Sequence, residues 1–232
     1  MRSITYHLGS SLALAALTLL STKAFAQSSF GGGSLLTPKP AKPEYLPERD
    51  SARGLEDYAR CVYKRQPTDV ERVLAMLPTD KGYDGAVRGL VKLPYDKCFT
   101  GGVKMTLDAS LLPGALAVAA YQAKFSEGAV MTVRVPDPPV PAEADLEARR
   151  QLALAAFGNC VVQSRSDGVR ALVLAKPISR EEDAAIATLA PVFNPCAPKG
   201  QTIQLSKPSL RAALARALYL ASVEARKTGG LP

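Results

Sequence analysis

An internal repeat limits the possible folds of this chain more than any other feature of its sequence. Residues 58–121 and 157–219 share one order: an aromatic residue, Cys-Val, helical segments interrupted by proline, a second cysteine, a glycine and a Leu/Ala-rich segment ending in tyrosine. Aligned positions lie 99 residues apart up to Leu90 and 98 apart from Cys98 onward, so one residue was gained or lost between them. The repeat predicts two copies of one structural unit. The aligned pairs include Cys61/Cys160, Val70/Val169, Pro78/Pro177, Asp84/Asp183, Leu90/Leu189, Cys98/Cys196, Leu112/Leu210, Leu116/Leu214 and Tyr121/Tyr219.

The first 26 residues have the pattern of a secretory signal peptide. Arg2 supplies a charged start, Leu12 to Leu20 an apolar core, and Ala24-Phe25-Ala26 a cleavage site. The apolar core, about nine residues, is far shorter than the roughly 20 residues that span a bilayer. An uncleaved anchor is the alternative, and a lipoprotein is excluded because no cysteine precedes Cys61. We expect a soluble mature chain in the periplasm or secreted from the cell.

Segments rich in glycine or proline divide the remainder. Gly31 to Gly33 and four following prolines are typical of a spacer that cannot bury enough apolar surface to fold. A second proline-rich segment lies between the two repeats. The expected organisation is a signal peptide at 1–26, a linker at 27–49, a first helical unit at 50–135, a linker at 136–141, a second helical unit at 142–227 and a tail at 228–232.

Within each unit the signals are mostly helical. Asp50 or Ser51 can cap the first helix of unit 1, and acidic residues follow Ala142 at the equivalent start. Second helices are expected at 67–77 and 166–176, each ended by the shared proline. The third helices are expected to start at Thr79 and Ser179, and Ser179 forms a capping box with Glu182. The fourth helices have the expected N-caps Asp108 and Ser206.

Short extended segments accompany these helices. Residues 103–107 and 201–205 precede the fourth helices, and residues 129–135 alternate between apolar and polar side chains, which predicts strands. The expected fold is therefore mainly α, with two pseudo-repeated four-helix units, short β segments and one disulfide in each unit.

Four cysteines allow three pairings. The repeat favours Cys61–Cys98 and Cys160–Cys196, because equivalent positions in a repeated fold have equivalent neighbours. Each bridge closes a loop of about 36 residues, worth about 3–4 kcal/mol in the chain-entropy model. A redox-active pair and a zinc site are the alternatives, and both lack the Cys-x-x-Cys spacing typical of such sites.

The composition excludes several kinds of catalysis and suggests no cofactor. The only histidine, His7, lies in the predicted signal peptide, so a mature chain has no imidazole for a triad or a metal. Carboxylate chemistry remains possible, as in glycoside hydrolysis. The candidate acids are Glu56, Asp57, Glu71, Asp84, Glu181, Glu182 and Asp183.

Only Asp84/Asp183 is acidic in both copies, and it follows the aligned basic pair Lys81/Arg180 by three residues. This spacing places both charges on one helical face. It is compatible with local electrostatics at a helix start, with a duplicated polar site or with an ion pair between the units.

The net charge of +8 raises the possibility of a polyanionic partner. The basic residues of unit 1 are not repeated in unit 2: Arg60, Lys64 and Arg88 align with Asn159, Gln163 and Ala187. No basic run is interleaved with aromatic residues, so nucleic acid is not an expected partner.

The second unit has a recognisable pattern in Phe157-Gly-Asn-Cys-Val-Val162, Val169-Arg-Ala-Leu172, Leu210-Arg-Ala-Ala-Leu214 and Ala217-Leu-Tyr219. It resembles uncharacterised secreted proteins of sphingomonad-type alphaproteobacteria with paired-cysteine helical repeats. The first unit matches this pattern more loosely. The resemblance implies a Gram-negative envelope setting and no particular activity or site.

The sequence thus predicts an exported, non-enzymatic binding or structural module whose partner is an unknown envelope protein or polymer. Two alternatives remain open. One is a cell-wall glycan hydrolase that uses Asp84 or Asp183 with Glu56, Glu71 or Glu182. The other is a binder of an anionic envelope polymer through a basic surface.

Overall fold

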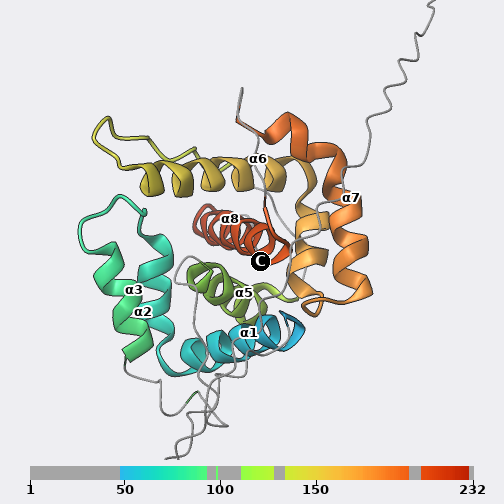
Figure 1. The fold of residues 1–232 in the computed structure, drawn as a ribbon, viewed down its shortest axis with the longest axis horizontal. Helices are drawn as coiled ribbons and strands as arrows, with labels where there is room; N and C mark the ends of the chain where they lie inside the picture. Colours follow the sequence, from blue (N-terminus) through green and yellow to red (C-terminus); the bar gives the residue numbers. More distant parts are fainter. Residues whose placement is uncertain (1–47, 93–97, 99–110, 128–133, 199–204, 230–232) are drawn as a thin grey trace, which may run out of the picture. The chain divides into compact units, whose positions relative to one another are not determined.

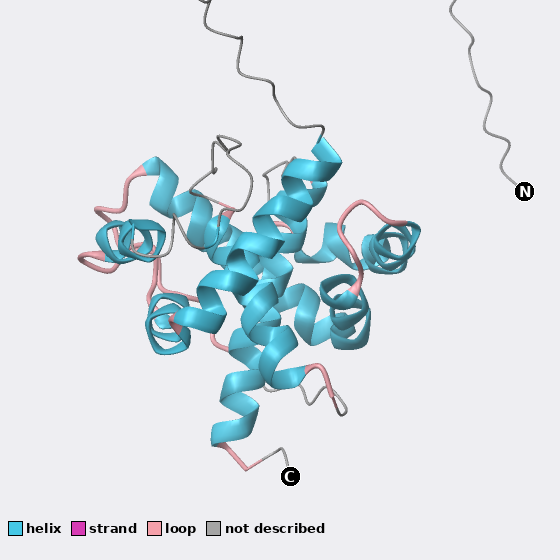
Figure 2. Ribbon diagram, turned by 90° about the horizontal axis from the view of Figure 1, so that it is seen from below, coloured by secondary structure: helices cyan, strands magenta, loops and turns pink. Residues whose placement is uncertain are grey.

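The described part of the chain is mainly α-helical, as the sequence predicts (Figures 1 and 2). The computed structural model describes residues 48–92, 98, 111–127, 134–198 and 205–229, all of which belong to one unit, Pro43–Pro232. None of the helices in these ranges is long and apolar enough to cross a membrane. The helices are α1 (Glu48–Arg65), α2 (Pro67–Ala75), α3 (Tyr83–Lys92), α5 (Leu112–Phe125), α6 (Leu146–Leu174), α7 (Arg180–Cys196) and α8 (Lys207–Lys227).

The predicted β segments are not seen in the described ranges. Residues 103–107, 129–133 and 201–204 and the predicted N-cap Asp108 lie outside those ranges. Arg134, Val135 and Leu205 are described and belong to no strand. Val135 is followed by a proline-rich run, which lacks the backbone N–H groups that a β ladder needs.

Three helix starts follow from side-chain caps. Asp145 accepts a hydrogen bond from the Ala148 N–H, and Ser179 and Ser206 cap α7 and α8 through the same i+3 contact. The first and third helices of unit 1 differ from expectation. Helix α1 begins at Glu48, before Asp50. Helix α3 begins at Tyr83 instead of Thr79, because Asp80 accepts from the Leu77 N–H and closes a turn there.

The first two helices expected in unit 2 are joined in α6. The helix continues across Arg165, whose non-helical backbone angles (φ −152°, ψ 58°) mark a kink at the expected boundary. In Figure 1 the segment after the kink runs beside α7. Helix α6 then ends at Leu174, shortly before the shared proline Pro177.

Helices α5 and α8 pack against each other at the centre of the helical body, with the other helices around them (Figure 1). Every residue of α5 from Leu112 to Tyr121 is buried, as expected for a helix that is apolar on all sides. The two helices lie in close contact at Gly114, where an added Cβ would lie 2.1 Å from the Cβ of Ala212. Helix α1 packs on α5, and α6 packs on α8.

Two disulfides join segments that are distant in the sequence: one links α1 to Cys98, and the other links α6 to α7. They link Cys61 to Cys98 and Cys160 to Cys196, the pairs that the repeat favours. The second bridge fastens the end of α7 to the middle of α6. The aligned tyrosines Tyr121 and Tyr219 lie in the core, at 1% and 3% exposure.

Candidate functional site

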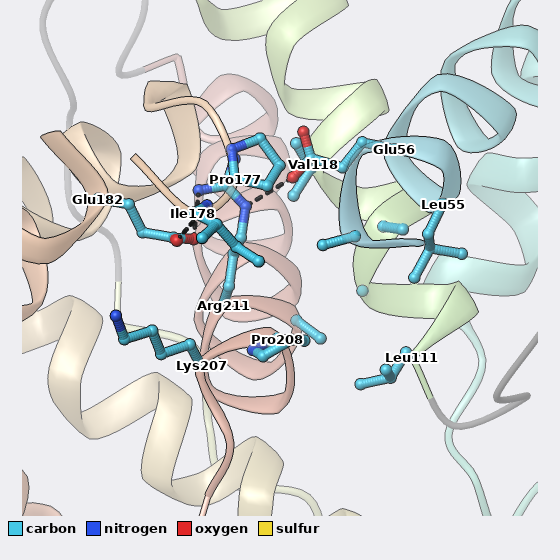
Figure 3. A pocket seen from close by; sticks show the side chains of 14 residues that line it. Leu55, Glu56, Leu111, Val118, Pro177, Ile178, Glu182, Lys207, Pro208 and Arg211 are labelled. Atoms are coloured by element: carbon cyan, nitrogen blue, oxygen red, sulfur yellow. Dashed lines mark hydrogen bonds and ion pairs between the residues drawn. The ribbon is translucent and has the colours of Figure 1, made fainter. Parts of the chain in front are cut away.

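Arg211 is a buried cation, 5% exposed, which projects from α8 between α1 and α7 (Figure 3). Its Nε donates to Glu56 Oε1 on α1 at 2.6 Å, and its Nη1 lies 3.4 Å from Glu182 Oε1 on α7. Its remaining hydrogen bonds go to backbone carbonyls at the end of α6 and just beyond: Leu172, Val173 and Ala175. We call Arg211, Glu56 and Glu182 the Arg211 cluster.

The Arg211 cluster connects four helices through charge-assisted hydrogen bonds. Burial raises the pKa of Glu56, and the neighbouring Arg211 opposes this shift. Glu182 Oε2 accepts from the Ile178 N–H at 2.7 Å, which holds the turn before α7, where Ile178 has a positive φ of 51°. All three guanidinium nitrogens therefore have protein partners, and the cluster holds helices together.

A cavity of about 40 Å³ adjoins this cluster, lined by Glu56, Glu182 and Arg211 with apolar neighbours such as Leu55 and Val118 (Figure 3). Ligand pockets usually enclose about 300–1,000 Å³. This cavity is far below that range and has room only for a water-sized molecule. We therefore assign the Arg211 cluster a structural role.

A much larger groove, of about 460 Å³, lies between α6 and α8. Its lining is predominantly apolar. The small residues Ala212, Ala213 and Ala217 of α8 form one side. The apolar lining includes Leu77, Leu111, Pro113, Val135, Pro136, Pro138, Pro139, Leu154, Leu205 and Leu220.

One wall of the groove is the proline-rich run 135–139. Asn159 of α6, only 6% exposed, holds this run in place: its Nδ2 lies 3.4 Å from both Pro136 O and Asp137 Oδ1. Gly158 beside it lets α6 approach α8, because an added Cβ would lie 3.0 Å from Ala213 O and from Ala217 Cβ. A segment that the sequence suggests is a linker thus contributes to the groove.

A guanidinium with incomplete pairing lines this groove. Arg216 of α8 donates through Nη2 to Met76 O, but its buried Nε has no hydrogen-bond partner in the part of the chain that the structure describes. Burial lowers the pKa of Arg216, and Tyr83 and Asp80 act in the opposite direction. Even so, Arg216 forms no ion pair with a carboxylate among the described residues.

Tyr83, which also lines the groove, is only 6% exposed. Burial raises the pKa of its phenol, and the charge of Arg216 lowers it. The phenol is therefore neutral at ordinary pH and lies within electrostatic range of the guanidinium. Other charged side chains that line the groove are exposed ones: Asp137, Glu147 and Arg150.

The aligned polar pairs suggested by the sequence do not meet in either cavity. Asp183 pairs with Lys207 at 2.5 Å rather than with Arg180. Asp84 and Lys81 are exposed and form no ion pair among the described residues. Neither Asp84 nor Asp183 lines the small cavity or the groove.

The other candidate acids have separate positions. Glu71 accepts from Tyr63 Oη and pairs with Lys124, both at 2.9 Å. Asp57 pairs with Arg60, and Glu181 is exposed. Of all the candidates, only Glu56 and Glu182 lie together, with Arg211 between them (Figure 3).

Sequence reasoning missed Arg211 and Arg216, which align with uncharged residues, and Asn159, which aligns with Arg60. The spacing of the sequence does indicate that Arg211 is buried. Arg211 lies at i, i+3, i+7 spacing with Leu214 and Leu218, which places it on an apolar helical face. Arg216 and Asn159 have no such signal, because the groove is formed by segments distant in sequence.

No protein-family model, curated protein or solved structure matches the chain.

Proposed function

We propose that this protein is an exported, non-enzymatic binding module of the Gram-negative envelope, with its ligand site in the groove between α6 and α8. The groove, with Arg216 in its lining, is the observation that carries this proposal. Its volume falls within the range of small-molecule sites, and a mostly apolar lining with few polar groups is typical of such sites.

Export is supported by the signal-peptide pattern at 1–26 and by the two disulfides. Disulfides form and persist in the periplasm and outside the cell, and they are rare in the cytosol. We expect expression with the natural N-terminus to give periplasmic or secreted protein that begins at Gln27. Intact protein that keeps residues 1–26 after cell fractionation would contradict export by this route.

We further propose that the unit consists of two related copies, 50–135 and 142–227, packed together through α5 and α8. The support is the contact between Gly114 and Ala212, which are aligned positions of the repeat. In a two-fold interface each residue near the axis meets its own counterpart. The two disulfides join aligned positions in the same way.

Binding in the groove can be tested with Nile red, a neutral apolar dye whose fluorescence rises in apolar surroundings. We expect saturable binding to the disulfide-bonded mature protein. Ala155→Trp places a large side chain in the groove lining and should abolish this binding. Ala187→Trp adds the same side chain on the exposed face of α7 and should leave it unchanged. Equal binding by both variants would contradict the groove as the ligand site.

A further inference from the structure

We propose, resting on the function above, that the ligand is a single-chain amphiphile with an anionic head group, a carboxylate or a phosphate. Its head group contacts Arg216 and Tyr83. Its alkyl chain lies along the apolar wall formed by the prolines at 136–139 and by Leu154 and Leu220.

The buried charge of Arg216 favours an anionic ligand. Burying a charge is costly unless it is paired, and the shift in the pKa of Arg216 reflects this cost. The protein supplies only the Met76 carbonyl as a hydrogen-bond acceptor among the described residues, and the nearby carboxylate of Asp80 instead accepts from Leu77 N. An anionic head group would supply the missing counter-charge, and it could form the bidentate contact that guanidinium groups favour.

The phenol of Tyr83 also favours an anionic head group. Its raised pKa keeps it protonated, so it can donate a hydrogen bond to an anion beside Arg216. A cationic ligand would meet the guanidinium as a like charge at the same place. The exposed acids Asp137 and Glu147 do not alter this preference at Arg216, because neither forms an ion pair with it.

The apolar lining of the groove favours a ligand with an alkyl chain. Free inorganic phosphate or acetate would fill only a small part of about 460 Å³ and leave the apolar walls exposed to water. An alkyl chain covers these walls, and each buried methylene contributes about 0.8 kcal/mol, which is nearly a fourfold gain in affinity. Head and tail therefore each contribute to binding.

The test compares ligands of one chain length by displacement of Nile red from the disulfide-bonded mature protein, below their aggregation concentrations. Dodecanoate and dodecyl phosphate should bind about ten- to a hundredfold more tightly than dodecanol, as expected for a charge-assisted hydrogen bond. Dodecyltrimethylammonium should bind more weakly than dodecanol. Acetate and inorganic phosphate should not displace the dye. The stronger of the two anionic ligands distinguishes a carboxylate from a phosphate head group.

Variants locate the head group. Arg216→Met should bring dodecanoate to near parity with dodecanol, Arg216→Lys should keep part of the preference, and Tyr83→Phe should lower it without abolishing it. Arg88→Met, which removes an exposed arginine outside the groove lining, should change nothing. If Arg216→Met does not fold, the ligand comparison with wild type and Tyr83→Phe is sufficient.

Equal binding of dodecanoate and dodecanol to wild type would overturn the inference. An anionic preference that persists in folded Arg216→Met, or binding of acetate as tight as that of dodecanoate, would also overturn it. In these cases groove-dependent binding of Nile red would leave the proposed function standing. Loss of Nile red binding from the wild-type protein would instead remove the proposed function itself.

Discussion

Replacing Arg211 by methionine should destabilise this protein strongly. The change keeps an unbranched apolar side chain but leaves Glu56 and Glu182 buried without their cation. It also removes the guanidinium donors of three backbone carbonyls, of which only Val173 O keeps another side-chain donor among the described residues, Gln122. Removing one partner of a buried ion pair typically costs about 3–5 kcal/mol. A typical domain is stable by only about 5–15 kcal/mol. For a domain of this size the melting temperature should fall by about 6–20 °C.

Denaturant unfolding followed by circular dichroism measures this loss, with the disulfides intact. Arg72→Met is the matched control, because Arg72 forms an exposed i, i+3 pair with Asp69 worth about 1 kcal/mol or less. The triple change Arg211→Met, Glu56→Leu, Glu182→Gln should recover most of the stability, because no buried charge remains unpaired and glutamine can still accept from Ile178 N.

The pH dependence has a definite sign. Without Arg211 the pKa of Glu56, already raised by burial, should rise further. An acid with a raised pKa in the folded state destabilises that state at neutral pH, and this cost falls as the pH drops through the raised pKa. The deficit of Arg211→Met should therefore shrink between pH 7 and about pH 5. A deficit below about 1 kcal/mol at pH 7, or one that grows on acidification, would refute the role of the Arg211 cluster.

Three further results are expected. Replacing Cys61 and Cys98 together by serine, or Cys160 and Cys196, should cost about 3–4 kcal/mol per bridge in thermal or chemical unfolding, and peptide mapping without reduction should find only these two pairs. Gly114→Ala should destabilise by at least about 1–3 kcal/mol, because its Cβ would lie 2.1 Å from the Cβ and 2.4 Å from the Cα of Ala212. Adding Ala212→Gly should recover only part of this loss, because the overlap with the Cα of residue 212 remains; a Gly114→Ala variant as stable as wild type would contradict the close helix crossing. A zymogram on purified peptidoglycan should stay blank, and a clearing band lost in Asp84→Asn or Asp183→Asn would favour the hydrolase alternative.

The cysteine pairs and the caps could be predicted because each depends on local or repeated information. Cys61 and Cys160, which are aligned in the sequence, bond to Cys98 and Cys196, which are also aligned. Ser179 and Ser206 contact residues only three positions away. The continuity of α6 across Arg165 could not be predicted, because backbone angles at a kink depend on the packing of α7.

The groove was also beyond sequence reasoning. It depends on Asn159 holding the run 135–139 against α6, and on the small residues of α8 leaving space. Asp84 and Asp183, the aligned acids of the repeat, lie outside both cavities. Arg216 aligns with the uncharged Val118, so the repeat alone gives no sign that Arg216 belongs to a site.

Native mass spectrometry of protein purified from the periplasm tests most directly whether the chain is exported, as proposed, and whether its groove holds an anionic amphiphile. The expected spectrum contains the chain from Gln27 with both disulfides formed, and also this species with one ligand bound, either co-purified or added as dodecanoate. The ligand should be released on denaturation and should be absent from folded Arg216→Met and Ala155→Trp. A wild-type spectrum without bound ligand, even after incubation with dodecanoate, would contradict the proposed site.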